Sequence, residues 1–150
     1  MVYVRGKLLH WLYGQRNHAN ALRYALRLKR LLQRWPASRT AIIGAECRSL
    51  VAEALGDLSK AAKQRGREIR LIEELQVKWA HDFPCPYGAS DLSDRLDLLA
   101  TVYDSAGHTA QAIAALRRSE RLCRANGLEF QGADFLSELT ASTPSRRRAI

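Results

Sequence analysis

Apolar residues recur every three or four positions along most of this chain, and no stretch alternates apolar and polar residues over a useful length. The spacing i, i+3, i+4, i+7 places side chains on one face of an α-helix, whereas a half-buried strand repeats every second residue. The clearest case is residues 18–35. Their predicted inward face consists of Ala21, Tyr24, Ala25, Leu28, Leu31, Leu32 and Trp35. This periodicity predicts an all-α fold.

Glycines and prolines divide the chain into seven predicted helices. Gly14, Pro36, Gly56 and Gly107 stand where a helix is expected to end, and Asp57 is placed to cap the helix that follows Gly56. Short turns make successive helices antiparallel neighbours, so we expect three antiparallel helical hairpins and a C-terminal helix. The predicted helices span residues 4–13, 18–35, 39 or 40 to 55, 58–80, 91–105, 108–126 and 132–141.

The length of the chain suits a single domain. We expect it over residues 1–142, with residues 143–150 as a flexible basic tail that contains Arg146, Arg147 and Arg148. The apolar spacing places Trp35 and Trp79 in its core. No apolar run approaches the roughly 20 residues that a bilayer span needs, so we expect no membrane insertion and a cytoplasmic location.

Residues 92–126 carry the pattern of a known helical repeat. Large, large, small, aromatic, turn, small and large residues occur there in the order Leu96, Leu99, Ala100, Tyr103, Gly107, Ala112 and Leu116. This hairpin resembles a tetratricopeptide repeat. The resemblance implies a right-handed array of hairpins, a role in binding other proteins, and second helices that line up along the outer surface.

The other hairpins follow this pattern more loosely. Ser49, Gly56 and Ala61 fit the second hairpin, but Arg48 and Arg65 stand where the family has apolar residues. The spacing between units is also irregular. A plain α-helical bundle is therefore the alternative to a repeat array.

Positive charge is concentrated at the N-terminus. The first 45 residues hold nine Lys or Arg and no Asp or Glu, whereas residues 46–140 hold twelve basic and fifteen acidic residues. A helix without acids cannot neutralise its arginines through pairs four residues apart. We therefore expect something anionic to do so, either a partner or an acidic face of the protein itself, for which Asp94 and Asp97 are candidates.

The basic residues follow helical spacing. At 100° per residue, one stripe lies opposite the apolar face of residues 18–35, and a similar stripe lies on residues 58–80. The predicted partner-binding residues are Arg23, Arg27, Arg30, Arg34, Lys60, Lys63, Arg67 and Arg70. Arg117, Arg121 and Arg124 form a third stripe, and in a tetratricopeptide-like array the three would merge into one basic ridge. The alternative is that each stripe is simply a solvated face.

Catalytic motifs are scarce. The chain has no phosphate-binding glycine loop, no nucleophile elbow and no H-E-x-x-H metal motif, so we predict no enzyme activity, no cofactor and no metal. An enzyme would need the loop that holds His81, Asp82 and Cys85, which offers three ligands where zinc usually takes four. The other two cysteines, Cys47 and Cys123, lie in apolar helical patterns and are expected to be reduced core residues.

Two functions remain in contention. The first is a non-catalytic adaptor that docks an acidic protein partner on the basic N-terminal hairpin, and the resemblance to a protein-interaction repeat favours it. The second is a nucleic-acid binder that contacts backbone phosphate through the same arginines. A membrane-surface protein is the weakest alternative, because the apolar side of residues 18–35 has the character of a core. The sequence leaves the oligomeric state open.

Overall fold

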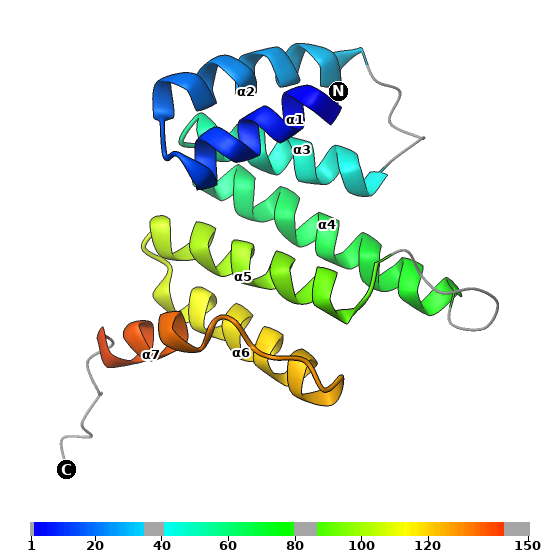
Figure 1. The fold of residues 1–150 in the computed structure, drawn as a ribbon, viewed down its shortest axis with the longest axis vertical. Helices are drawn as coiled ribbons and strands as arrows, with labels where there is room; N and C mark the ends of the chain where they lie inside the picture. The colour runs from blue at the N-terminus through cyan, green and yellow to red at the C-terminus, as the bar shows by residue number, and fades with distance from the viewer. Residues whose placement is uncertain (1, 35–40, 80–86, 143–150) are drawn as a thin grey trace. The chain divides into compact units, whose positions relative to one another are not determined.

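The computed structural model describes residues 2–34, 41–79 and 87–142, and every regular element in these ranges is helical (Figure 1). The predicted all-α class is confirmed. No helix in the described ranges combines the length and the apolar character that crossing a membrane requires. In chain order the elements are α1 (Val2–Leu9), the π-helical turn η1 (His10–Gly14), α2 (His18–Gln33), α3 (Ala41–Ala54), α4 (Leu58–Trp79), α5 (Ala89–Ser105), α6 (Thr109–Ala125) and α7 (Ala133–Ser142).

The predicted helix ends agree with the structure to within a few residues. The Asp57 side chain accepts a hydrogen bond from the backbone N–H of Lys60 at 3.1 Å, which confirms its predicted role as the cap of α4. Gly56 and Gly107 follow α3 and α5 with φ of +77° and +75°, a conformation in which a Cβ is costly. Helices α3 and α5 thus end before glycines with positive φ, and α4 begins after the side-chain cap of Asp57.

Helices α1 and α5 both begin two residues before their predicted starts. α5 begins at Ala89 instead of residue 91, because Asp91 reaches back from the third helical position and accepts a hydrogen bond from the N–H of Gly88 at 2.9 Å. The first predicted helix, residues 4–13, begins earlier and changes from α to π geometry at His10.

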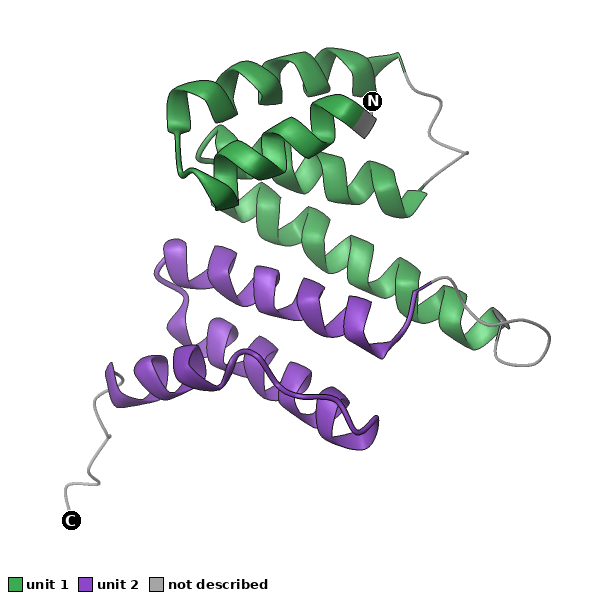
Figure 2. Ribbon diagram, in the orientation of Figure 1, with its two compact units in different colours: residues 1–85 green, residues 86–150 purple. Residues whose placement is uncertain are grey.

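Helix packing divides the chain into two compact units, residues 1–85 and residues 86–150 (Figure 2). Unit 1 contains α1, η1, α2, α3 and α4, and unit 2 contains α5, α6 and α7. Whether the whole of 1–142 acts as one domain stays a prediction. The predicted tail, residues 143–150, lies outside the described residues, as do Trp35 and the side chain of Trp79.

The core of unit 1 joins α1, α2 and α3. Its buried residues are mostly those of the predicted apolar stripes, and α2 packs against both α1 and α3, while α4 packs along α3. Helix α2 therefore turns its apolar face to the core and its polar face to solvent, as amphipathic spacing requires. The buried core residues are Val4, Leu8, Ala21, Ala25, Leu28, Cys47, Leu50 and Val51.

Unit 2 is built on the packing of α5 against α6, with α7 resting on α6. A polar seam crosses its core, where Ser93 and Ser119 are hydrogen-bonded through their hydroxyls at 2.8 Å and the Ser93 hydroxyl lies 3.1 Å from the Cys123 sulfur. All three side chains are buried. Because each polar atom has a partner, the seam costs little desolvation energy.

Candidate basic surface and pocket of unit 1

The four arginines of the predicted α2 stripe are all exposed. None of them forms an ion pair with a residue that the structure describes, and the first turn of α2 contains no acid. The helix is started by Asn17, whose side chain accepts a hydrogen bond from the N–H of Asn20 at 3.1 Å. We call Arg23, Arg27, Arg30 and Arg34 the α2 stripe. It is a set of solvent-facing cations without internal counter-charges among the described residues.

The predicted stripe on α4 is exposed in the same way. Lys60, Lys63, Arg67 and Arg70 face solvent and form no ion pair within the described parts of the chain. Since α2 and α4 both pack on α3, the two stripes belong to one compact unit. The third stripe lies on α6 in unit 2, where Arg124 pairs with Glu120 at 3.1 Å. The merging of the three stripes stays a prediction.

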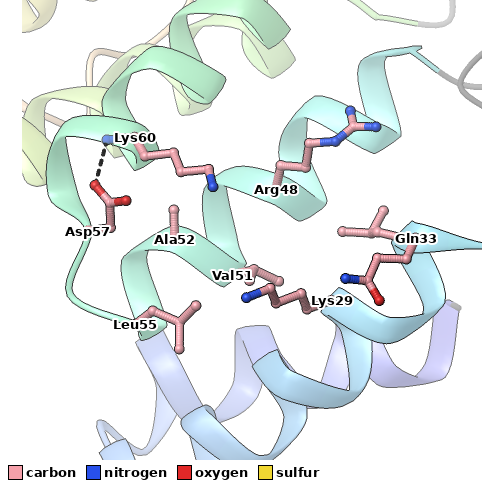
Figure 3. Close-up of a pocket in the computed structure, with 9 residues that line it drawn as sticks. Lys29, Gln33, Arg48, Val51, Ala52, Leu55, Asp57 and Lys60 are labelled. Carbon is pink, nitrogen blue, oxygen red and sulfur yellow. Dashed lines mark hydrogen bonds between the residues drawn. The ribbon is translucent and has the colours of Figure 1, made fainter.

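A pocket lies between the two basic helices of unit 1, over the back of α3 (Figure 3). It has a volume of about 310 Å³ and was not predicted from the sequence. Apolar side chains of α2 and α3 line it together with three cations and one carboxylate. The lining residues are Lys29, Leu32, Gln33, Arg48, Val51, Ala52, Leu55, Asp57 and Lys60.

The cations of this pocket come from three different helices. In Figure 3 the side chains of Lys29 on α2 and Lys60 on α4 extend over the pocket from opposite sides. The Arg48 guanidinium lies back along α3 over Gly44, where a Cβ would stand only 3.1 Å from one of its nitrogens. The single carboxylate, Asp57, is already bonded to the N–H of Lys60. The pocket therefore carries excess positive charge above an apolar floor.

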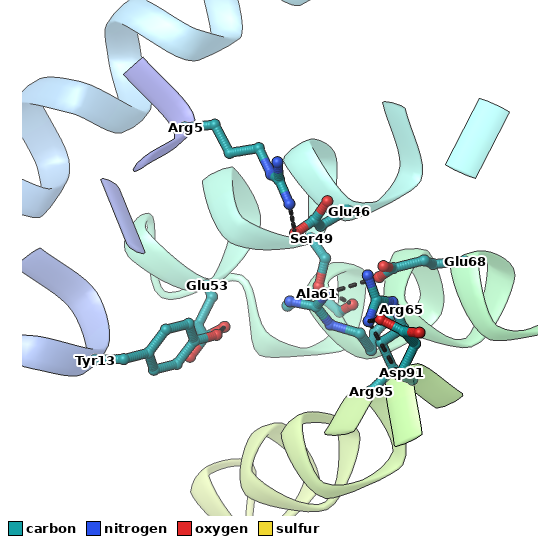
Figure 4. A network of polar contacts seen from close by, with 10 residues as sticks. All are labelled: Arg5, Tyr13, Glu46, Ser49, Glu53, Ala61, Arg65, Glu68, Asp91 and Arg95. Atoms are coloured by element: carbon teal, nitrogen blue, oxygen red, sulfur yellow. Dashed lines mark hydrogen bonds and ion pairs between the residues drawn. The ribbon is translucent and has the colours of Figure 1, made fainter. Parts of the chain in front are cut away.

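Unit 1 also contains several polar side-chain contacts, which Figure 4 shows together with Asp91 and Arg95 of unit 2. Arg65 donates a hydrogen bond to Glu68 at 2.7 Å, and the two side chains are 1% and 0% exposed. Arg5 of α1 donates to Glu46 of α3 at 2.7 Å. The Arg5–Glu46 pair links α1 to α3, and the Arg65–Glu68 pair lies buried within α4. Arg65 stands where the repeat pattern has an apolar residue, and the structure shows that it is nevertheless buried.

A second link joins η1 to α3. The Tyr13 hydroxyl donates a hydrogen bond to the Glu53 carboxylate, so a residue of the π-helical turn is tied to a helix forty residues away in sequence. Burial raises the pKa of Glu53, and the Tyr13 hydrogen bond and the positive charge of Arg65 offset part of that rise. Burial, with the Glu53 charge beside it, also raises the pKa of Tyr13. Tyr13 thus serves as a neutral hydroxyl donor that links η1 to α3.

The thiols and carboxylates give no sign of a reactive centre in the described residues. Cys47 and Cys123 are free and buried, and burial raises the pKa of Cys47 to about 11, which suppresses its thiolate. No group of three or more His, Cys, Asp or Glu side chains in the described ranges is placed to hold a metal ion. The loop with His81, Asp82 and Cys85 lies outside those ranges.

The aspartates on α5 have local roles. Asp91 caps the helix and its backbone carbonyl accepts a hydrogen bond from Arg95 at 2.9 Å. Asp97 is half-buried, and burial raises its pKa, an effect that a hydrogen bond from Ser119 partly offsets and the charge of Asp94 increases. Among the described residues, neither Asp94 nor Asp97 forms an ion pair with an arginine of the α2 stripe.

No protein-family profile, curated protein sequence or solved structure matches this chain.

Proposed function

We propose that this chain is a non-catalytic, tetratricopeptide-like adaptor that docks an acidic segment of a partner protein on the α2 stripe. The observation that carries the proposal is the exposure of all four stripe arginines without an ion pair to a described residue. Arginine presents a planar fork of donors that suits carboxylate, and four such groups on one helix face form an extended anion-binding surface. A cytoplasmic location, where the free thiols stay reduced, is part of the same proposal.

Burial in unit 2 supports the repeat assignment. Ala100 and Ala112, the small residues of the repeat pattern, are fully buried where α5 and α6 pack, and Leu96 and Leu116 are buried beside them. Gly107 occupies the turn with a positive φ, as the pattern demands. These features are what a tetratricopeptide hairpin needs at its crossing point, namely small residues that let two helices approach closely.

Unit 1 contains a corresponding set of residues. Ser49 and Ala61 are fully buried, the Ser49 hydroxyl donates to the backbone carbonyl of Ala61 at 2.9 Å, and Gly56 has nearly the φ of Gly107. We therefore infer that α3 with α4, and α5 with α6, are two versions of one antiparallel hairpin, with α1 and α2 as a third. In the proposed right-handed array, α7 is the terminal helix.

The alternative function is nucleic-acid binding through backbone phosphate. The same exposed arginines favour it, since phosphate and carboxylate are both bound by the guanidinium fork. The one Tyr of α2, Tyr24, is partly buried against the core of unit 1 and does not belong to the exposed stripe, so this alternative implies binding without sequence preference.

The proposal is tested by reversing two charges of the stripe. Arg27→Glu with Arg30→Glu should abolish retention of an acidic partner that co-purifies with the wild-type chain at low salt. Because both residues are exposed, each change should alter the free energy of unfolding by no more than about 0.5 kcal/mol. Arg117→Glu with Arg121→Glu is the matched control, since it changes the charge equally in unit 2.

Two results would decide against an acidic protein partner. If the stripe variant retains every partner that the wild type retains, the arginines are only a solvated face. If the partner is nucleic acid, log affinity should fall linearly with log salt concentration, with a slope of about −0.9 per duplex phosphate neutralised or about −0.7 for a single strand.

A further inference from the structure

The pocket of unit 1 combines an apolar surface with cationic side chains. Leu32 and Val51 form an apolar floor, and Leu55 at its edge is 42% exposed. Above the floor stand Lys29 and Lys60. A purely electrostatic site does not need an apolar floor, and a purely apolar site does not need lysines on opposite sides.

The apolar surface continues from the pocket along α2. Leu22 and Leu26 are 40% and 42% exposed, and they precede Lys29 by seven and three residues. Side chains at this spacing share one face of a helix, so the two leucines lie on the face that carries Lys29 to the pocket. Seven residues of helix span about 10 Å. The combined surface is therefore longer than the pocket and suits an extended ligand.

The pocket lining is distinct from the α2 stripe, whereas Leu26 lies one turn before Arg30 and borders the stripe. Lys29 is about 100° around the helix from Arg30, the nearest stripe residue in sequence. The stripe residues have no pocket-lining role, and the residues of α2 that line the pocket are Lys29, Leu32 and Gln33. Substitutions at pocket-lining residues can therefore leave the stripe arginines intact, and substitutions in the stripe can leave the pocket lining intact.

We infer that the pocket anchors a short segment of a partner protein in which one large apolar side chain is flanked by carboxylates. The inference rests on the proposed adaptor function and names the chemistry of its ligand. The apolar side chain packs on Leu32, Val51 and Leu55, and the flanking carboxylates pair with Lys29 and Lys60. Apolar anchors of this kind supply affinity, whereas charges at the rim supply orientation and association rate.

Charge and composition favour a peptide over nucleic acid at this site. The one carboxylate of the pocket, Asp57, is bonded to the backbone of α4, so the lysines attract an anionic ligand. None of the described lining residues is aromatic, so the pocket offers no ring on which a base could stack. Contact with phosphate would not stabilise the exposed leucines that precede Lys29 on α2. Covering them with an apolar side chain removes apolar surface from water and is favourable.

The test uses two short labelled peptides with the same number of carboxylates, one with a central Leu and the other with Gly in its place. The wild-type chain should bind the Leu peptide about tenfold more tightly than the Gly peptide, as burial of one leucine side chain predicts. Binding is followed by fluorescence anisotropy at constant ionic strength, and folding of each variant by circular dichroism.

Variants of the pocket separate its two components. Leu55→Ser, which changes a half-exposed residue, should remove most of the difference between the two peptides. Lys29→Gln with Lys60→Gln should weaken binding of both peptides and leave the difference in place. Arg117→Gln with Arg121→Gln removes equal charge from unit 2 and should leave the affinity for both peptides unchanged.

Equal affinity of the wild type for the Leu and Gly peptides would overturn the inference. So would normal binding of the Leu peptide by the double lysine variant. In either case the proposed function survives if Arg27→Glu with Arg30→Glu still abolishes binding of both peptides. If neither peptide binds the wild type but single-stranded RNA does, both the inference and the acidic-partner proposal fail.

Discussion

The buried ion pair between Arg65 and Glu68 should make Arg65 one of the residues on which the stability of this chain depends most. Their side chains are 1% and 0% exposed and their charged atoms lie 2.7 Å apart. Replacing Arg65 by Met keeps the length of the side chain but leaves the Glu68 carboxylate buried without that cation. Breaking such a pair costs about 3–5 kcal/mol. We expect a loss of that size in the free energy of unfolding.

An exposed pair in the same chain provides the control. Arg124 and Glu120 also lie on one helix, 3.1 Å apart, but their side chains are 80% and 37% exposed. Exposed pairs of this spacing contribute about 0.3–0.5 kcal/mol, so Arg124→Met should have an effect roughly ten times smaller than Arg65→Met.

A double substitution tests the reason for the loss. If the cost comes from an uncompensated charge, then Arg65→Met combined with Glu68→Gln should recover at least about 2 kcal/mol of the loss, because neither buried side chain is then charged. Urea unfolding of the four proteins, followed by circular dichroism, measures this. A single Arg65→Met variant that loses less than about 1 kcal/mol would refute the reasoning, as would a double variant that is no more stable than the single one.

Three further predictions concern other residues of the chain. Burial raises the pKa of Glu53 above its ordinary value of 4.5, so the folded chain binds more protons than the unfolded chain between these two pKa values and stability falls as the pH rises through them. Glu53→Gln should flatten this fall and raise stability at pH values above the folded-state pKa. An unchanged pH dependence in urea unfolding would contradict this. Cys47 and Cys123, at 0% and 2% exposure, should escape alkylation by iodoacetamide in native buffer and react fully in denaturant. If mass spectrometry of the native protein shows either cysteine labelled at the rate of a free thiol, its predicted protection is wrong. Gly107→Ala should lower the free energy of unfolding by about 1–2 kcal/mol, because the φ of Gly107 is +75°. Gly66→Ala within α4, where a Cβ meets nothing within 4 Å, should raise it by up to about 1 kcal/mol. A higher melting temperature for Gly107→Ala than for Gly66→Ala would show that the turn tolerates a side chain.

Local chemistry explains why most of the helical architecture could be predicted from the sequence. Apolar spacing identified the inward faces of α2 and α5, and Gly56 with Asp57 marked the turn between α3 and α4. These signals act over three or four residues, and each is present in the chain segment that it shapes. The start of α5 was misplaced because a capping aspartate can stand at the first or the third position, and Asp91 takes the third.

The polar interior of unit 1 could not be predicted in this way. Arg5 pairs with Glu46, and Tyr13 with Glu53, across 41 and 40 residues, and no local pattern marks such pairs. Arg65 departs from the repeat pattern, and its burial depends on tertiary packing that no local pattern marks. The exposure of the α2 stripe was predicted from its spacing, whereas the pocket was missed because its lining comes from α2, α3 and α4 together.

The inward placement of glutamates in unit 1 has a consequence for how the chain behaves in solution. Glu46 and Glu68 are engaged with Arg5 and Arg65, so they offer no local counter-charge to the exposed stripes. The exposed cations of the α2 stripe should therefore make copies of the chain repel one another at low ionic strength, and a multivalent anion should bridge them. Mixing the purified chain with a long polyanion should therefore produce turbidity at a defined charge ratio, and added salt should clear it within the range where the screening length falls below the spacing of the arginines.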